Sequence, residues 1–452
     1  MLSDTEETIR NKITPYQIWI LFALTVLNMQ DGFDILAISF AATAITEEWS
    51  ISRSSLGIVF SAGLFGMMVG ALFLSRVADK VGRKPVAVLG LCLSGVGMLV
   101  AMLAPTINML ILGRVLTGIG VGGILVSLNT LVAEYAGKKY RGIAIAIFQL
   151  GFATGAFLSG FIAAWFLDVA NWRYIFGFGA MTSFLFIPLI LSLPESNSFL
   201  AKSKKPNALA LINKGRQKFG QNRLERLPTD PNQNLNAKTP RNTLALFSAD
   251  YWLKTLLICC CFFMLLTLLY FMLTWTPKIL VDMGFSEAEG NRGGRLINLT
   301  GMLGVVLIGL LSLRILPSLI VGIYLSLLGV ILLFFGDLSP VVGGVFVLIG
   351  AAGFMLHGSM IGLYSTVPAL YPVELRATGT GWAIGLSRLG AVLGPALAGI
   401  LLDQGWNITD LFKAYAVLAF VAAGLAVILW VILRNENKKH TGYKPKEKAE
   451  AY

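Results

Sequence analysis

The sequence predicts an all-α membrane protein with twelve transmembrane helices arranged as two pseudo-symmetric six-helix bundles. Of its 452 residues, 56% are apolar and only 13% are charged, which is typical of a membrane protein. The apolar residues form long blocks between short polar breaks, and about 20 such residues cross a bilayer core of ~30 Å as a helix. Because the bilayer core offers no water to unpaired main-chain groups, each block is expected to be helical.

Six apolar blocks precede a long basic segment and six follow it. The expected spans are residues 17–45, 54–75, 85–104, 108–134, 142–167, 172–193, 252–281, 294–313, 316–336, 341–370, 377–402 and 411–433. The first block follows a polar stretch and is not followed by a small-residue cleavage site, so we expect a retained span and not a signal peptide.

These blocks divide the chain into two bundles and two polar segments. We expect an N-terminal six-helix bundle at 1–194, a cytoplasmic basic linker at 195–251, a C-terminal six-helix bundle at 252–434 and a cytoplasmic tail at 435–452. The linker is rich in Lys, Asn, Gln and Pro and has no long apolar run, which predicts a flexible tether.

The two halves resemble each other in sequence. When residues 142–160 are aligned with residues 381–399, eight of nineteen positions are identical. They are four glycines, one alanine, one isoleucine and two leucines. The glycine pairs are Gly142 with Gly381, Gly151 with Gly390, Gly155 with Gly394, and Gly160 with Gly399. Parallel repeats of this kind indicate a two-bundle transporter with its substrate midway between the halves.

The net charge of +12 is explained by its location. Lys and Arg gather in the linker, the tail and two short loops, whereas the opposite loops are neutral or acidic. This positive-inside pattern places both termini in the cytoplasm of a cell inner membrane protein, and nucleic-acid binding is not needed to explain it. The four cysteines lie inside apolar blocks without disulfide or zinc spacing, so no metal site is expected.

Charged side chains inside a span cost roughly 2.5–3.5 kcal/mol each on insertion scales and are functional candidates. Asp31 and Asp34 lie three residues apart and therefore share one face of a helix. Two carboxylates in a poorly hydrated site repel each other when both are ionised, which lets one of them carry a proton. The alternative is a structural pair locked to an arginine of another span.

Two arginines also lie inside spans. Arg388 corresponds to Gln149 in the repeat, so both positions are expected to face a central cavity. The guanidinium fork of Arg388 suits a substrate carboxylate, although a permanent ion pair with Asp31 or Asp34 is an alternative. Arg114 could neutralise these carboxylates, couple them to gating or form a structural ion pair. The expected arrangement is one shared pocket between the bundles for both acids and Arg388.

Aromatic side chains in the second half could line this cavity and stack on a planar substrate, although ordinary packing is an alternative for each. They are Tyr270 and Trp275, followed by Pro277, in one span, Tyr364 in another, and Trp382 near Arg388. His357 is a weaker candidate, because a lone membrane histidine more often joins two helices by a hydrogen bond.

The segment from Arg76 to Lys84 resembles the signature cytoplasmic loop of the major facilitator superfamily. The resemblance implies that Asp79 caps a helix or forms an ion pair across the bundle interface, while Arg83 and Lys84 hold the cytoplasmic gate. Ser75 stands where the signature begins with glycine. The chain also has Gly155-Ala156 where drug antiporters carry Gly-Pro, which favours symport.

Within the superfamily, three stretches are similar to the aromatic acid:proton symporter family. They are Asp31-Gly32-Phe33-Asp34, Glu134-Tyr135 with Arg141-Gly142, and the run from Tyr371 to Gly390 that includes Glu374, Arg376 and Arg388. The resemblance implies transport roles for Asp31, Asp34, Asp79 and Arg388. It also implies gating or structural roles for Glu134, Arg141, Glu374 and Arg376.

The resemblance implies a monomeric symporter that imports benzoate, hydroxybenzoates or muconate with protons, and that needs no cofactor. A symporter of aliphatic carboxylates or sugars is the alternative on the same fold. A membrane enzyme would need a cluster of His, Cys or acidic groups with metal or nucleophile spacing, which the sequence lacks. A transporter-like sensor would need a folded signalling domain, for which the linker and tail are too small and polar.

Overall fold

The computed structural model describes residues 14–203, 206–219, 222–226, 243–312, 314–335 and 342–440. Within these ranges the side chains of residues 137–139, 243, 244, 342, 373, 374, 377 and 437–440 lie outside the description. The regular secondary structure of the described chain is helical. Twelve of its helical segments are long and apolar enough to cross a membrane, which confirms the predicted fold class.

The N-terminal six spans are α2 (Pro15–Trp49), α3 (Arg53–Val81), α4 (Arg83–Met102), α5 (Ile107–Tyr135), α6 (Gly137–Val169) and the pair α7 (Arg173–Leu185) with α8 (Ile187–Ser192). The C-terminal six are α12 (Trp252–Asp282), α13 (Glu287–Leu311), α14 (Pro317–Phe335), α15 (Val342–Leu370), α16 (Val373–Asp403) and α17 (Ile408–His440). Each expected span coincides with one of these segments, and six of the helices, α2, α3, α6, α13, α16 and α17, extend beyond the apolar block by a turn or more.

Local sequence sets where several helices begin. Thr14 and Gln17 form a capping box at the start of α2, with Pro15 at the first helical position. Ser286 and Glu289 form a second capping box at the start of α13, and the Ser52 side chain accepts from Ser55 N at the start of α3. These polar caps supply hydrogen bonds to helix ends just outside the apolar blocks.

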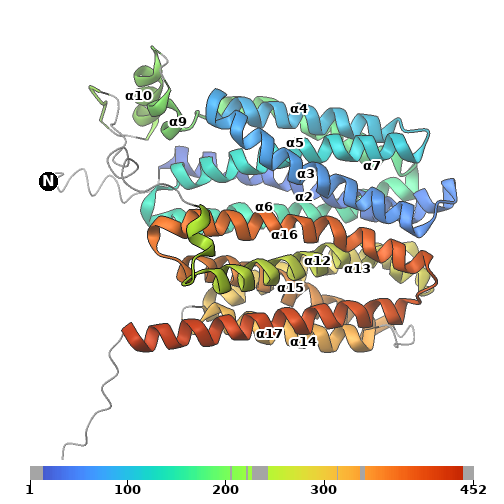
Figure 1. Ribbon diagram of the computed structural model, residues 1–452. Helices are drawn as coiled ribbons and strands as arrows, with labels where there is room; N and C mark the ends of the chain where they lie inside the picture. The colour runs from blue at the N-terminus through green and yellow to red at the C-terminus, as the bar shows by residue number, and fades with distance from the viewer. Residues whose placement is uncertain are drawn as a thin grey trace, which may run out of the picture.

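The two bundles lie one above the other in Figure 1 and repeat the same helix pairings. In the first, α6 packs along α2, where a Cβ at Gly155 would come within 1.8 Å of Met29 O. In the second, α16 packs along α12, where a Cβ at Gly394 would come within 2.4 Å of Thr267 O. The repeated glycines of the sequence therefore mark the same close helix contact in each bundle.

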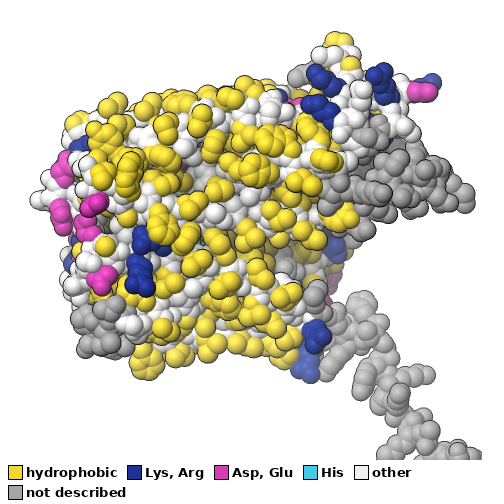
Figure 2. All heavy atoms as spheres, turned by 180° about the vertical axis from the view of Figure 1, so that it is seen from behind, with side chains coloured by type: hydrophobic (Ala, Val, Ile, Leu, Met, Phe, Trp, Pro, Cys, Tyr) yellow, Lys and Arg dark blue, Asp and Glu magenta, His cyan; other side chains and the backbone are white. Residues whose placement is uncertain are grey.

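Apolar side chains cover the sides of the molecule, and charged side chains gather at its two ends (Figure 2). Large exposed residues such as Phe73, Leu103, Trp165 and Leu303 are 60–67% exposed. In a water-soluble protein such a continuous apolar belt would be a liability, whereas in a bilayer it is the surface that contacts lipid.

Part of the linker is folded, so the expected flexible tether is wrong for residues 197–202 and 208–219. This part contains α9 (Asn197–Lys202) and α10 (Ala208–Lys218). Phe199, Leu200 and Ile212 form a small apolar cluster between them. Phe219 packs against Tyr16 and Tyr135 at the end of the first bundle, with ring centroids 5.4 and 5.6 Å apart. These few apolar residues anchor a segment that is polar on average.

We predict that Gly155→Leu destabilises the first bundle by at least about 1–3 kcal/mol, because the new side chain collides with the α2 main chain. Gly142→Leu in the same helix is the matched control, since a Cβ there meets nothing within 4 Å. Thermal unfolding of the detergent-purified proteins measures the difference. Equal melting temperatures for the two variants would contradict this packing.

Candidate substrate and proton site

Asp34 lies inside the first bundle and accepts hydrogen bonds from one side chain on α2 and one on α4. Its Oδ1 accepts from Gln30 Nε2 at 2.7 Å, and its Oδ2 accepts a short hydrogen bond from Ser94 Oγ. Gln30 Nε2 also donates to Gly179 O and Ser183 Oγ, both at 3.1 Å. The network joins α2, α4 and α7, and the carboxylate is fully buried.

Asp31 has a different environment one turn earlier on α2. Its side chain is also fully buried, yet neither carboxylate oxygen has a hydrogen-bond partner. Asn28, a further turn back, donates a hydrogen bond from Nδ2 to Phe148 O at 2.6 Å and not to Asp31. A buried ionised carboxylate without partners is costly, whereas the protonated acid carries no net charge.

Arg114 binds main chain and not the two carboxylates. Its Nη1 donates to Asp34 O at 2.7 Å and its Nη2 to Ile35 O at 3.2 Å. The guanidinium occupies the space beside Gly63 of α3, where a Cβ would lie 2.9 Å from Nη2. No ion pair joins it to Asp31 or Asp34 in the part of the chain that the structure describes. Arg114 thus places a buried positive charge near Asp34, joins α5 to α2 by hydrogen bonds and packs against α3.

Arg388 lies at the contact between α16 and α3 and forms no ion pair with Asp31 or Asp34 among the described residues. Its Nη1 approaches Met67 Sδ at 3.3 Å, and it has no carboxylate partner among the described residues. It is close enough to Tyr364 to interact electrostatically, and Tyr364 is similarly close to Tyr270. The structure therefore groups Arg388 with two tyrosines of the second bundle, and the single pocket expected for Arg388, Asp31 and Asp34 stays a prediction.

The other expected cavity residues lie in three different settings. Trp275 is fully buried, donates Nε1 to Pro395 O at 3.0 Å, and meets Phe60 of α3 edge-on at 5.3 Å, so it packs at the bundle interface. Trp382 is 42% exposed and packs against Phe247, so it is not part of a buried wall. Gln149 is half-buried in α6.

His357 lies between two helices of the second bundle. Its Nδ1 is 3.1 Å from Gly353 O in α15, and its ring fills the space beside Gly301 of α13. His357 thus packs between α13 and α15, and its Nε2 has no hydrogen-bond partner.

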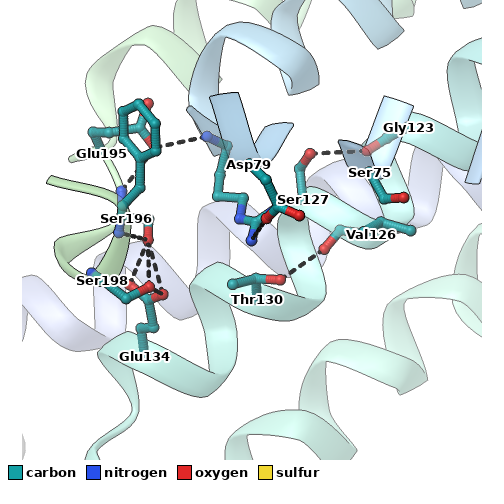
Figure 3. Close-up of polar contacts among 12 residues, drawn as sticks. Ser75, Asp79, Gly123, Val126, Ser127, Thr130, Glu134, Glu195, Ser196 and Ser198 are labelled. Carbon is teal, nitrogen blue, oxygen red and sulfur yellow. Dashed lines mark hydrogen bonds and ion pairs between the residues drawn. The ribbon is translucent and has the colours of Figure 1, made fainter. Parts of the chain in front are cut away.

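The signature loop makes its contacts within the first bundle, as Figure 3 shows. Asp79 pairs with Arg83 one turn later at 2.6 Å. The main-chain nitrogens of Arg83 and Lys84 donate to the Glu195 carboxylate at 2.9 and 3.2 Å, which caps the start of α4. The expected ion pair of Asp79 across the bundles is therefore absent from the described contacts, and Glu195 serves as the cap.

Glu134 tethers the beginning of the linker to α5. Its carboxylate accepts from Ser196 Oγ at 2.8 Å and from Ser198 Oγ through a shorter bond (Figure 3). Lys84 Nζ donates to Leu193 O at 2.9 Å. Arg141 and Arg376 each donate to a nearby main-chain oxygen, of Ala133 at 2.9 Å and of Tyr371 at 3.5 Å. The Glu374 side chain lies outside the described residues.

The opposite ends of the bundles are joined by charged groups that sequence reasoning did not select. Asp403 of α16 accepts from the main-chain nitrogens of Arg53 and Ser54 at 3.0 and 2.8 Å, and so caps α3 of the other bundle. Asp282 pairs with Arg53 at 3.5 Å and with Lys278 at 2.7 Å. We call these four groups, Arg53, Lys278, Asp282 and Asp403, the interbundle latch. They line a cleft with Thr46 and Leu56.

Twelve apolar helices, an apolar belt and buried charges around the bundle contact define a multi-pass membrane protein of the two-bundle transporter type. The family model described as Major Facilitator Superfamily matches residues 21–383, and the chain belongs to that superfamily. It is therefore a transporter and not an enzyme.

Curated relatives and a solved structure agree with this assignment. The gallate transporter of Pseudomonas putida is 32% identical, with 94% of each chain covered. The 4-hydroxybenzoate transporter PcaK of Pseudomonas aeruginosa is 30% identical, covering 92% of this chain and 93% of the relative. The xylose transporter XylE from E. coli, in an inward open conformation, shares the fold with a TM-score of 0.67 at 17% identity, covering 92% of this chain and 96% of that one.

We predict that Asp403→Asn loosens the latch, because the amide keeps only one of the two acceptor oxygens that bind the start of α3, and a lost hydrogen bond costs about 0.5–1.5 kcal/mol. The readout is the rate at which a maleimide labels a cysteine placed at the cleft residue Leu56, against the same background without that cysteine. The rate is expected to rise by up to about tenfold, as 1.4 kcal/mol allows. Asp410→Asn, at the same end of the molecule, is the control. An unchanged rate in Asp403→Asn, or an equal rise in the control, would show that the latch does not hold the cleft closed.

Proposed function

We propose that this protein imports small aromatic carboxylates, such as benzoate, hydroxybenzoates or muconate, together with protons by alternating access. The observation that carries the proposal is Arg388, a half-buried cation at the bundle contact without a carboxylate partner among the described residues. The aromatic acid transporters among its relatives support this substrate class. A neutral sugar would leave such a cation uncompensated, so the guanidinium favours an acid.

Arg388, Tyr364 and Tyr270 form the proposed substrate group. The guanidinium supplies paired donors for the carboxylate, and the two phenol rings supply flat apolar surface and hydroxyls for a ring with polar substituents. Tyr270 is buried, and the Tyr364 ring is held edge-on by Phe262 at 5.2 Å. The site thus combines one charge with rigid aromatic walls, which suits a planar anion.

Asp31 is the proposed proton carrier. Asp34 accepts two hydrogen bonds, which suits its ionised form, while Asp31 accepts none, which suits its protonated form. With Asp31 protonated, the charges of Asp34 and Arg114 cancel inside the first bundle. With Asp31 ionised, a net negative charge is left in a buried region. The free-energy cost of burying that charge favours a conformation in which water reaches Asp31 on α2.

The coupling of proton movement to substrate import follows from the charges that cross the membrane. An anion entering a cell against a negative-inside potential meets about 2.3 kcal/mol per charge per 100 mV, and a proton that moves with it removes this cost. The folded linker helices α9 and α10 occupy one end of the molecule, and acidic side chains gather at the other (Figures 1 and 2). By the positive-inside rule we assign the linker and both termini to the cytoplasm, which places the latch outside an inner membrane.

We predict that Arg388→Gln weakens benzoate binding by at least about tenfold, the ratio that 1.4 kcal/mol represents, because the carboxylate loses a charge-assisted partner. Arg388→Lys keeps the charge and is expected to lose less. Arg223→Gln, in the linker, is the control. Binding of labelled benzoate to detergent-purified protein measures the change, with unlabelled 4-hydroxybenzoate, muconate, succinate and xylose as competitors. Competition by xylose but not by aromatic acids would reject the proposed substrate class.

We predict that Asp31→Asn abolishes accumulation of substrate driven by a proton gradient while exchange of labelled for unlabelled substrate continues. The neutral amide imitates the protonated acid, so the bundles still rock but carry no proton. Proteoliposomes with an imposed pH gradient, followed by an exchange assay on the same preparation, separate the two steps. Gradient-driven accumulation at the wild-type level in Asp31→Asn would reject Asp31 as the carrier.

A further inference from the structure

One face of α13 forms a lipid-facing stripe. Leu299, Leu303, Val306 and Leu310 are 43%, 61%, 51% and 60% exposed, and their spacing of three and four residues places them along one side of the helix. Arg292 and Arg295 continue the same spacing toward the helix start, and they are exposed and half-buried respectively. Two arginines therefore lie on a helix face that otherwise contacts lipid.

Their depth corresponds to the edge of the apolar belt. The helix α13 begins at Glu287, and at 1.5 Å per residue Arg295 lies about 12 Å along it. Long basic side chains at such depths reach toward the lipid headgroups. Basic side chains are visible among the apolar ones in Figure 2, close to the end where acidic side chains gather.

Arg295 also crosses the contact between the two bundles. Its Nη1 donates to Gly160 O of α6 at 3.2 Å, and its guanidinium lies over the Phe161 ring at 4.5 Å. The Arg295 stem fills the space beside Gly160, where a Cβ would lie 2.4 Å from its Cγ. Phe161 is itself 50% exposed, so this seam between α6 and α13 is open to lipid.

Neither arginine forms a direct ion pair in the described chain, although Glu289 is near enough to Arg292 for a weaker electrostatic interaction. Arg292 lies over the Phe346 ring at 5.4 Å. The nearest acid on its own helix, Glu289, is occupied by Ser286, whose main-chain nitrogen and hydroxyl donate to it at 2.9 and 2.8 Å. Two guanidinium groups at the membrane edge thus have donors available for an anion.

We propose that Arg292 and Arg295 bind the phosphate of a phospholipid headgroup at the seam between α6 and α13. Guanidinium groups recognise phosphate through paired hydrogen bonds, and the stripe of Leu299, Leu303 and Val306 continues from them as a surface for an acyl chain. Because Arg295 already bridges the bundles, the bound lipid stabilises the conformation in which this seam is closed. Lipid is favoured over a soluble anion because the site opens sideways onto the apolar belt.

The test measures lipid adducts of the detergent-purified full chain by native mass spectrometry during titration with phosphatidylglycerol or phosphatidylethanolamine. The Arg292→Gln/Arg295→Gln variant is expected to bind either lipid about tenfold more weakly, the ratio that 1.4 kcal/mol represents. Arg292→Gln alone changes only an exposed side chain and is expected to show part of the loss in a protein of unchanged melting temperature. Retention at the wild-type level in both variants would overturn the proposal.

Two further arms separate this site from general effects. Arg434→Gln is the matched control, since Arg434 also lies over an aromatic ring, that of Trp430 at 5.1 Å, on another span. It is expected to retain lipid like the wild type, and an equal loss there would show that any interfacial arginine suffices. Inorganic phosphate and benzoate are added as soluble competitors. Displacement of the lipid by either at millimolar concentration would assign the arginines to a soluble anion and reject the lipid site.

Discussion

The cost of a charge buried in a bilayer organises this protein. Asp31, Asp34 and Arg114 lie inside the first bundle, where an uncompensated charge costs several kcal/mol. Hydrogen bonds offset that cost to different extents. Asp34 accepts from two donors and Arg114 donates to two main-chain oxygens, whereas Asp31 has no hydrogen-bond partner. This inequality singles out one of the two acids for proton transfer, which spacing along a helix could not do.

The bundles communicate through contacts that depend on small residues and charged helix ends. A Cβ at Gly399 would come within 2.4 Å of Arg53 O, and this close approach brings Asp403 onto the start of α3. At the signature loop, by contrast, Asp79, Arg83 and Glu195 contact only their own bundle. In the described conformation the charged contacts between the bundles therefore include the latch, and the described contacts of the signature loop stay within the first bundle.

The sequence predicted the fold well because the bilayer leaves few alternatives. The lengths of the apolar blocks were sufficient to predict the twelve helices, because a membrane span depends on local composition. The repeated glycines were sufficient to predict the two bundles. The folded part of the linker was missed because four apolar residues, Phe199, Leu200, Ile212 and Phe219, anchor it without forming an apolar block. The latch was missed because Asp403 and Asp282 lie at span ends, where acids are common.

The candidate site was predicted in its parts but not in its arrangement. The buried charges Asp31, Asp34, Arg114 and Arg388 were found because charge inside an apolar block is conspicuous. Their pairing depends on the rotation of each helix about its axis, which a single sequence does not specify. Hence Ser94 and Gln30 were overlooked as partners of Asp34, and the ion pair considered for Arg388 with either acid is absent from the described contacts.

The central claim is that Asp31 gains or loses a proton as substrate binds and leaves. Infrared difference spectroscopy of the purified protein on addition of benzoate tests it directly, because the C=O stretch of a protonated carboxylic acid is distinct from that of a carboxylate. The account predicts a change in this band that persists in Asp34→Asn and is lost in Asp31→Asn. A band that persists unchanged in Asp31→Asn would contradict it.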